Sequence, residues 1–359
     1  MTRDTSTPIR TGLIGYGFAG KTFHAPLISA VPGLVLKAIS SSKPDAVKAD
    51  FPAVTVYADP LALMESDVDL IVIASPNDTH APLAEAALKA GKHVVVDKPF
   101  TLTLTEARHL GAVAKAERRL LSVFHNRRYD SDFLGVKSVI ESGRLGRVTH
   151  FESHFDRFRP LVRDRWREHA IPGGGLWFDL GPHIIDQALQ LFGLPERVTA
   201  TIATQRSGGQ AADYAHCILH YGSMRAVLHA SMLVAGGTHR FTVHGEGGSL
   251  IKPTLDGQET QLLAGLRPGD REWGVDPEAM TLFTATGSEA LATPRGDQSR
   301  YYRDVAEAIS VDSRNPVTSL EALAVMAVLE AAEISSRDGR SVAPALTDAE
   351  KAAFQNGDQ

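Results

Sequence analysis

The sequence predicts an α/β protein of two domains, in which a doubly wound parallel sheet is followed by an α+β domain with an antiparallel sheet. Three observations lead to this fold class. Short apolar segments alternate with helical patterns over the first 125 residues, and this rhythm changes after Asn126. The chain of 359 residues is also long enough for roughly two domains. We therefore expect one domain at residues 1–126 and a second at residues 127–359.

The first domain contains six apolar segments that are rich in Val, Ile and Leu and show little polar alternation. Such segments are typical of buried parallel strands. The expected strands are 10–14, 34–39, 54–57, 70–74, 93–96 and 120–124, with helices near 19–30, 81–90 and 104–116.

The second domain has a mixed pattern. A loop is expected at 157–175, which contains Pro160, Pro172 and three consecutive glycines. Turns are expected at 221–223 and at Gly236-Gly237, and segment 253–294 is expected to form strands and loops. The expected strands are 148–156, 198–204, 214–219, 225–232 and 240–245; the expected helices are 131–142, 182–191, 301–310 and 319–335, and Thr347 with Glu350 forms a capping box for a last one.

The composition excludes several classes of function. A net charge of −5 argues against general nucleic-acid binding. The single cysteine, Cys217, excludes an internal disulfide and a thiolate cluster. The 14 histidines are scattered along the chain, so no metal site is expected. No apolar run is long enough to span a bilayer, and the first nine residues lack a signal-peptide core, so we expect a cytoplasmic protein without a membrane partner.

A glycine motif follows the first expected strand. It is Gly15-Tyr16-Gly17-Phe18-Ala19-Gly20, and a helical pattern comes after it. In this setting the first glycine permits a tight turn, the second lets a pyrophosphate approach the backbone, and the third allows close helix–strand packing. The free N–H groups at the helix start bind the anion. The motif predicts a dinucleotide site; the alternative is a glycine-rich turn without a ligand.

The end of the second strand indicates which dinucleotide binds. NAD-binding sites carry an acidic residue there for the ribose 2′-hydroxyl. This chain has Ser40, Ser41, Ser42 and Lys43 instead, and the first carboxylate is Asp45. Hydroxyls and a cation suit a 2′-phosphate, so we expect NADP rather than NAD. The alternative is that these are ordinary turn residues.

Asp97-Lys98-Pro99 follows the strand expected at 93–96, where ligands of an open α/β sheet bind. An amine in this place can bond a substrate hydroxyl and stabilise negative charge on oxygen. Further along, Asp179 and His183 are four residues apart, so a helix would place them on one face. Imidazole is a natural general base for an alcohol proton. The alternative is that Asp179 caps a helix, Pro182 occupies its first turn and His183 is packed.

Together these motifs resemble the Gfo/Idh/MocA family of oxidoreductases, whose pattern combines Gly-x-Gly-x-x-Gly, Glu-Lys-Pro and Gly-Gly-Gly-x-x-x-Asp-x-x-x-His. Here Asp97 replaces the glutamate, which leaves the role of that carboxylate open. The segments 16–26 and 124–128 further resemble the NADP-dependent scyllo-inositol dehydrogenase branch. The resemblance implies a Rossmann domain, then a substrate-binding and oligomerisation domain with a mostly antiparallel open sheet.

The resemblance also implies where ligands lie. It places Ser75, Pro76, Asn77 and His80 in a loop beside the cofactor, with Asp97, Lys98, Pro99 and Asn126 in contact with it, and Pro99 could follow a cis bond. It implies a homodimer or homotetramer formed through the second sheet. Residues expected to hold substrate hydroxyls are Arg127, Arg157, Trp166, Arg167 and Tyr302; the last four could equally be surface or packing residues.

These residues predict an NADP-dependent enzyme that moves a hydride to or from a secondary alcohol of a polyol or sugar. His183 would accept the hydroxyl proton, Lys98 would support the oxygen, and Asp179 would tune the histidine or hold a neighbouring hydroxyl. Two alternatives remain at this point. One is a reductase of keto-sugars or other carbonyls, and the other is a non-catalytic sensor that binds NADP.

Overall fold

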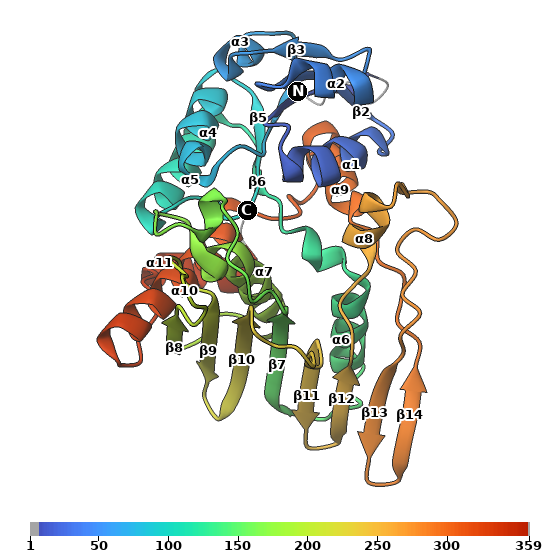
Figure 1. Ribbon diagram of the computed structural model, residues 1–359, viewed down its shortest axis with the longest axis vertical. Helices are drawn as coiled ribbons and strands as arrows, with labels where there is room; N and C mark the ends of the chain where they lie inside the picture. The colour runs from blue at the N-terminus through green and yellow to red at the C-terminus, as the bar shows by residue number, and fades with distance from the viewer. Residues whose placement is uncertain (1–6, 358–359) are drawn as a thin grey trace.

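The computed structural model describes residues 7–357 and arranges them in two sheets with helices packed between and around them (Figure 1). Of the nine N-terminal residues without a signal-peptide core, the first six lie outside the described residues. No helix within residues 7–357 has the length and apolarity to cross a bilayer.

The first sheet is parallel, with the strand order β3-β2-β1-β4-β5-β6. The order reverses between β1 and β4, and ligands of such sheets bind at this switch point, beyond the carboxyl ends of the strands. The predicted fold class of this region is confirmed. The strands are β1 (Ile9–Ile14), β2 (Leu34–Ser40), β3 (Thr55–Tyr57), β4 (Leu70–Ile73), β5 (His93–Val96) and β6 (Leu121–Val123).

Helices pack on this sheet so tightly that every residue of β4 is buried. The helix predicted near 19–30 is divided: a π-helical turn (Gly20–His24) precedes a short α1. Helices α2 and α3 were not predicted, although each begins at a proline, a residue that favours the first helical position. The helices are α1 (Ala25–Ser29), α2 (Pro44–Asp50), α3 (Pro60–Met64), the 3₁₀ turn Asn77–Thr79, α4 (His80–Lys89) and α5 (Leu104–Glu117).

The second sheet has eight strands in the order β14-β13-β12-β11-β7-β10-β9-β8, and only β7 and β10 pair in parallel. The mostly antiparallel sheet is therefore confirmed, as is the turn at 221–223 between β9 and β10. Gly236-Gly237 does not join neighbouring strands, because β7 lies between β10 and β11. The strands are β7 (Val148–Asp156), β8 (Arg197–Ala203), β9 (Tyr214–Tyr221), β10 (Met224–Ser231), β11 (Phe241–Gly245), β12 (Gly248–Lys252), β13 (Met280–Thr284) and β14 (Gly287–Leu291).

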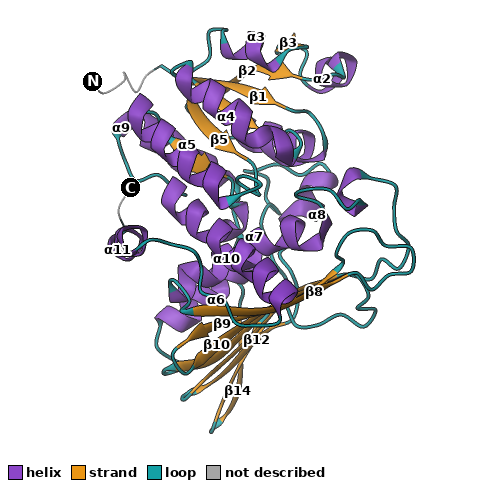
Figure 2. Ribbon diagram, turned by 90° about the vertical axis from the view of Figure 1, so that its left-hand side faces the viewer, coloured by secondary structure: helices purple, strands orange, loops and turns teal. Residues whose placement is uncertain are grey.

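Helices α7 (Gly175–Phe192) and α10 (Ser319–Asp338) cover one face of this sheet, and Figure 2 shows the other face without a helix. Side chains alternate along each strand, so Phe151 and Phe155 of β7 are buried beneath the helices. The alternate positions carry histidines. The open face holds His150 and His154 on β7, His216 and His220 on β9, His229 on β10 and His244 on β11. The histidines are scattered along the sequence, but the interpretation that they are also scattered in the fold is wrong.

Helix α7 corrects another expectation. It begins at Gly175, seven residues before the predicted start, so Pro182 lies inside the helix and Asp179 does not cap it. An interior proline costs a helix about 3 kcal/mol. Helix α7 tolerates it because most of its residues are buried between the two sheets, and Trp177 donates a hydrogen bond to the Leu329 carbonyl on α10 (3.2 Å).

Residues near the end of the chain return to the first sheet. Tyr301 donates to Ser122 on β6 (2.8 Å), Ser122 donates to the Val317 carbonyl (3.0 Å), and Asn315 donates to the Leu121 carbonyl (2.9 Å). These bonds fasten the segment to β6, and the Asn315 bond occupies a backbone carbonyl of this edge strand. The capping box at Thr347 is confirmed, while α8 in segment 253–294 was not predicted. The remaining helices are 3₁₀ turns Asn126–Tyr129 and Trp166–Glu168, α6 (Ser131–Glu141), α8 (Gln258–Leu263), α9 (Ser299–Val311) and α11 (Asp348–Asn356).

Candidate active site

The glycine turn lies at the carboxyl end of β1, at the switch point of the sheet. Gly15 has φ +96°, and a Cβ there would lie 2.5 Å from the Ala74 carbonyl oxygen. A Cβ on Gly20 would overlap the Gly15 carbonyl, whereas a Cβ on Gly17 would meet no atom within 4 Å. The first and third glycines are therefore required by packing. The second faces open space, which fits the approach of a dinucleotide to the backbone.

The carboxyl end of β2 carries the serine-rich segment. Ser40 is buried, while Ser42 and Lys43 are exposed, and the Lys43 N–H donates to Ser41 Oγ (3.0 Å). That bond uses the Lys43 backbone. Within residues 7–357 the Ser42 hydroxyl and the Lys43 side-chain amine make no hydrogen bond or ion pair, so both are free to contact a ligand.

The loop after β4 is held from two sides. Ser75 shares a hydrogen bond with Thr79 (2.6 Å), and Asn77 donates to the Gly173 carbonyl (3.1 Å). His80 is buried, and its ring nitrogens lie 2.8 Å from the Pro99 carbonyl and 3.1 Å from the Ser75 carbonyl. His80 thus connects Ser75 to the Asp97–Pro99 segment, and Asn77 connects the same loop to the triple glycine.

Lys98 reaches across to the second domain. Its Nζ atom donates to the Asp179 carbonyl (2.6 Å) and to Asp179 Oδ1 (3.2 Å) on α7. The peptide bond between Lys98 and Pro99 is cis. Residues that are more than eighty positions apart in the sequence therefore meet at one point.

Asp97 contacts the Lys98 backbone and the buried His24. Its Oδ1 accepts the Lys98 N–H (2.8 Å), and its Oδ2 lies 3.7 Å from Nε2 of the buried His24. Burial raises the pKa of Asp97, but His24 and Lys98 oppose this more strongly and lower the pKa to about 2. On its other side His24 shares a hydrogen bond with the Tyr302 hydroxyl. Asp97 therefore stays ionised and holds the Lys98 backbone.

Asp179 and His183 lie on α7 and face the same cavity, which has a volume of about 470 Å³. Burial raises the pKa of Asp179, but the charges of Lys98, Arg167 and Arg157 hold it well below its usual range. Burial lowers the pKa of His183 well below the usual histidine value, and the charges of Lys98 and Arg127 lower it further. The carboxylate is therefore ionised and the imidazole neutral near pH 7. The His183 Nδ1 atom is buried and has no hydrogen-bond partner within the described residues.

The cavity brings together the three predicted catalytic residues and some of the predicted cofactor and substrate contacts. Phe18, Ala19, Asp97, Lys98, Asn126, Arg127, Arg157, Arg167, Asp179 and His183 line it. Two predicted substrate contacts do not. Tyr302 is fully buried beneath His24. Trp166 stacks under the Arg167 guanidinium, whose Cζ atom lies 4.9 Å from the centre of the Trp166 ring. Tyr302 is therefore a packing residue, whereas Trp166 is partly exposed and stacks on Arg167, which lines the cavity.

The cavity also contains a group of cations that was not predicted as a group. Six arginines and Lys98 line the cavity, against three carboxylates; the arginines are 127, 157, 159, 163, 165 and 167, and the carboxylates are 97, 179 and 259. Five of these arginines lie at positions 157–167, so they are close together in the sequence as well. In a chain of net charge −5, this cavity is locally basic.

Some of these arginines are neutralised and others are not. Arg127 pairs with Asp130 (2.9 Å) and Glu259 (3.1 Å), and Arg165 pairs with Glu168 (2.9 Å). Within residues 7–357 the guanidinium groups of 157, 159 and 163 make no hydrogen bond or ion pair with a side chain. Burial and the positive charge of Arg159 lower the pKa of Arg157, despite the nearby Asp179 and Glu259.

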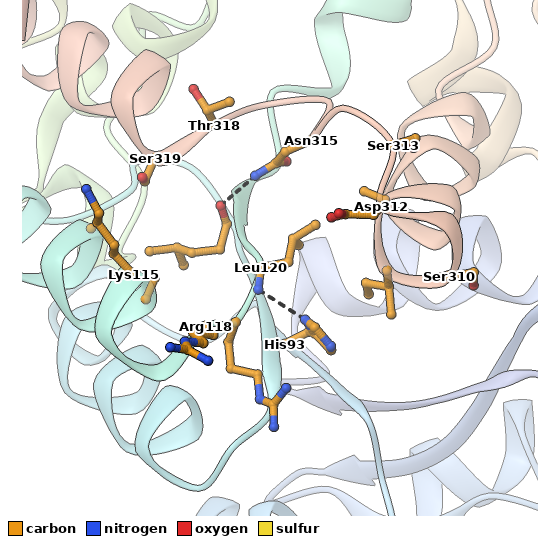
Figure 3. A pocket seen from close by; sticks show the side chains of 16 residues that line it. His93, Lys115, Arg118, Leu120, Ser310, Asp312, Ser313, Asn315, Thr318 and Ser319 are labelled. Carbon is orange, nitrogen blue, oxygen red and sulfur yellow. Dashed lines mark hydrogen bonds between the residues drawn. The ribbon is translucent and has the colours of Figure 1, made fainter. Parts of the chain in front are cut away.

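A second hollow, of about 670 Å³, is lined by residues at the starts of β5 and β6 and by residues near α9 (Figure 3). Its walls include His93, whose Nδ1 accepts the Leu120 N–H (3.0 Å), and Asn315, which bonds Leu121. His93 and Leu121 begin β5 and β6, so this hollow is at the amino ends of the strands. Ligands of open α/β sheets bind at the carboxyl ends. The cavity with Lys98 and His183 is therefore the candidate active site.

Comparison with known proteins identifies the family. The family model "Oxidoreductase family, NAD-binding Rossmann fold" of the Gfo/Idh/MocA group matches residues 9–125, and its partner, "Oxidoreductase family, C-terminal alpha/beta domain", matches residues 137–343. The chain is 53% identical over 330 residues to the uncharacterized oxidoreductase YdgJ of Escherichia coli K12, covering 90% of this chain and 95% of that protein.

Two further relatives span almost the same length. The NADP(+) scyllo-inositol 2-dehydrogenase IolW of Bacillus subtilis 168 is 39% identical, covering 93% of this chain and 95% of that protein. A crystal structure of an oxidoreductase from Klebsiella pneumoniae is 56% identical, with a TM-score of 0.93, and covers 98% of this chain and 99% of that one. Because both family models match and these relatives extend over nearly the whole sequence, the chain belongs to the Gfo/Idh/MocA family of oxidoreductases.

Proposed function

We propose that this protein is an NADP-dependent oxidoreductase that moves a hydride between NADP and a secondary alcohol or ketone of an inositol-like polyol or sugar. The observation that carries the proposal is the meeting of the two domains. Lys98 from the end of β5 bonds Asp179 (2.6 Å) on α7 and lines one cavity with His183. The relative IolW, named as an NADP(+) scyllo-inositol 2-dehydrogenase, favours the same substrate class and cofactor.

The residues present fit a nicotinamide dinucleotide, which supplies or accepts the hydride when it is bound. The open space at Gly17 suits the pyrophosphate, and the exposed Ser42 and Lys43 suit a 2′-phosphate better than a 2′-hydroxyl. NADP is therefore preferred over NAD. The residues proposed to hold it are Gly15, Gly17, Phe18, Ala19, Gly20, Ser40, Ser41, Ser42, Lys43, Ser75, Pro76, Asn77, His80, Asp97, Lys98, Pro99 and Asn126.

The protein's own groups handle the proton and the charge. His183 is neutral near pH 7, so it can take the hydroxyl proton at Nε2, the nitrogen opposite the buried Nδ1. Lys98 donates a hydrogen bond to the same substrate oxygen and stabilises its developing negative charge. Asp179 stays ionised and orients the Lys98 amine. A protonated His183 would return the proton in the reverse direction, so a keto-sugar reductase would use the same groups.

The unpaired cations of the cavity favour a substrate that carries a carboxylate or a phosphate. A neutral polyol would leave the partly buried Arg157 and Arg159 without a counter-charge, whereas Arg163 is exposed to solvent. An anionic group would form charge-assisted, bidentate hydrogen bonds with these guanidinium groups. We therefore add sugar acids and sugar phosphates to the inositol-like polyols and sugars among the proposed substrates.

The test is a substrate panel with NADP and with NAD, followed through the absorbance of the reduced cofactor. Matched pairs such as glucose with glucuronate and glucose with glucose 6-phosphate isolate the effect of the charge, and inositols complete the panel. Lys98→Ala should depress turnover while NADP binding stays largely intact; unchanged turnover would remove Lys98 from the mechanism. Tight NADP binding without turnover of any member would favour the sensor alternative.

We further propose that the protein works in the cytoplasm as a homodimer or homotetramer that forms through the second sheet. The uncovered face of that sheet supports the proposal. Light scattering of the purified protein measures the mass of the assembly directly, and a monomer at micromolar concentration would refute it.

A further inference from the structure

We propose that the open face of the second sheet binds one divalent transition metal, with zinc as its type, through His154, Asp156 and His229. One donor atom from each residue lies within 4.8 Å of the other two. His154 and Asp156 are two positions apart on β7, and His229 is directly opposite His154 on β10. Because β7 and β10 pair in this register, three donors that are distant in the sequence project from one patch of the sheet.

The donor atoms already have the spacing of a metal site. His154 Nδ1 lies 3.3 Å from Asp156 Oδ2, and His229 Nε2 lies 3.5 Å from Asp156 Oδ1. Tetrahedral zinc with bonds of about 2.0–2.1 Å places neighbouring ligand atoms about 3.4 Å apart. Little movement would therefore be needed to bring all three onto one ion, with a fourth position left for water.

A second observation comes from the carboxylate. The Asp156 side chain is only 3% exposed, and its Oδ1 atom is buried without a hydrogen bond in the described part of the chain. An acceptor in this situation lacks the partner that buried polar atoms normally have. A cation at the centre of the three side chains would satisfy it.

The outer contacts orient these ligands as they do in metal sites. His154 Nε2 lies 2.9 Å from Glu152 Oε2, which leaves Nδ1 directed at Asp156. Thr238 donates to Asp156 Oδ2 (2.7 Å). A carboxylate that holds the second nitrogen of a histidine ligand is a common feature of zinc sites. Two imidazoles and one carboxylate suit zinc and its neighbours in the transition series, whereas magnesium prefers oxygen ligands.

This site would be separate from the catalytic cavity, because none of the three ligands lines it. A bound ion would join β7 to β10, the one parallel pair in the sheet. Its role would be structural, and its presence does not depend on the proposed hydride transfer.

The test uses the full chain without an affinity tag, stripped with EDTA and titrated with zinc chloride or magnesium chloride in a calorimeter. We expect one zinc per chain, a zinc-dependent rise in melting temperature, and no response to magnesium. Asp156→Asn and His229→Ala should abolish binding, and Glu152→Gln should weaken it about 10- to 100-fold. His244→Ala is the control, since His244 lies on the same face but bonds Ser249 (2.7 Å) and should leave binding unchanged.

Melting curves without metal establish whether the variants are folded. If one of the two ligand variants does not fold, the other still tests the site. Zinc binding that is absent in the wild type, or that persists unchanged in Asp156→Asn, would overturn the site. Light scattering of the same samples shows whether zinc binding changes the mass of the assembly. Zinc that binds only as the assembly grows, in the wild type and the variants alike, would place the ion between copies and also overturn the proposal.

Discussion

The two walls of the active-site cavity are built in different ways. The wall from the first sheet depends on backbone shape: Gly15 and Gly20 have no room for a side chain, and Gly17 leaves its space to a ligand. The wall from the second domain depends on side-chain charge, with arginines at positions 157–167 facing Asp179 and His183 on α7. Substitutions in the first wall should therefore act through sterics, and those in the second through protonation and charge.

The largest expected effect is in the second wall. His183→Asn should lower kcat/KM by about 10²–10⁴-fold, which is the usual contribution of a general base. His109→Asn, on the exposed surface of α5, is the control and should have no effect. If His183→Asn keeps most of its activity, another group takes the proton.

The pH profile of the wild type sharpens this prediction. Burial lowers the pKa of His183, so the neutral base persists as the pH falls through the usual histidine value of about 6.5. In the oxidation direction kcat/KM should hold its plateau there and decline only at more acidic pH, where the imidazole becomes protonated. An acid limb centred at or above about pH 6.5 would contradict the assignment.

The next effect contrasts two glycines of the first wall. Gly20→Ala brings a Cβ against the Gly15 carbonyl, a backbone atom, so we expect a loss of about 1–3 kcal/mol in the free energy of unfolding. Gly17→Ala should stay within about 0.5 kcal/mol of the wild type. It should instead raise the Kd for NADP at least about tenfold, or 1.4 kcal/mol, because the new methyl group occupies the ligand's space. Denaturant unfolding and calorimetric titration measure the two quantities, and the same outcome for both variants would break the contrast.

A third experiment examines the unpaired arginines. Arg159→Ala should raise KM for an acidic sugar about tenfold, the loss of one hydrogen bond to a charged group, and leave its neutral partner unaffected. Arg163→Ala should have a smaller effect, because solvent screens its exposed charge. Arg165→Ala is the matched control, because Glu168 already neutralises Arg165. The Kd for NADP should not change; a weaker Kd with unaltered discrimination between substrates would assign these arginines to the cofactor phosphates.

The smallest effect is expected at the exposed end of β2. Lys43→Ala should reduce the preference for NADP over NAD only about two- to fivefold, because solvent screens an exposed charge. Lys37→Ala, which is also exposed on β2, serves as the control. The effect should shrink as salt is added, and a preference that does not respond to Lys43→Ala at low salt would exclude a contact with the 2′-phosphate.

Much of this structure could be predicted from local sequence patterns. The parallel strands are continuous apolar segments, so the sequence reveals them, and the strand ends then place the glycine turn and Lys98. The start of α7 was mistaken because Pro182 resembles a first-turn proline, while tertiary burial of Trp177 and its neighbours keeps the helix intact around it. Tyr302 could not be assigned to the core in advance, since only the return of α9 places it under His24.

The histidines show a different limit. The alternation His150-x-Glu152-x-His154-x-Asp156 is visible in the sequence and indicates one face of a strand. His229 joins that face only through a parallel pairing of β7 with β10, across a separation of 75 positions that no local pattern encodes. The arginines of the cavity were equally visible but were interpreted one by one, and their shared direction follows from the fold.

The return of the C-terminal segment to β6 has a consequence for how the chain is made. Ser122 and Leu121 find partners among residues 301–317, and the Leu104 N–H donates to Glu330 (2.7 Å) on α10. A nascent chain that has emerged only as far as β6 still exposes an unpaired strand edge to solvent. The nucleotide-binding half reaches its final packing only after the ribosome has synthesised nearly the whole polypeptide, so translation arrested before residue 301 leaves an aggregation-prone fragment.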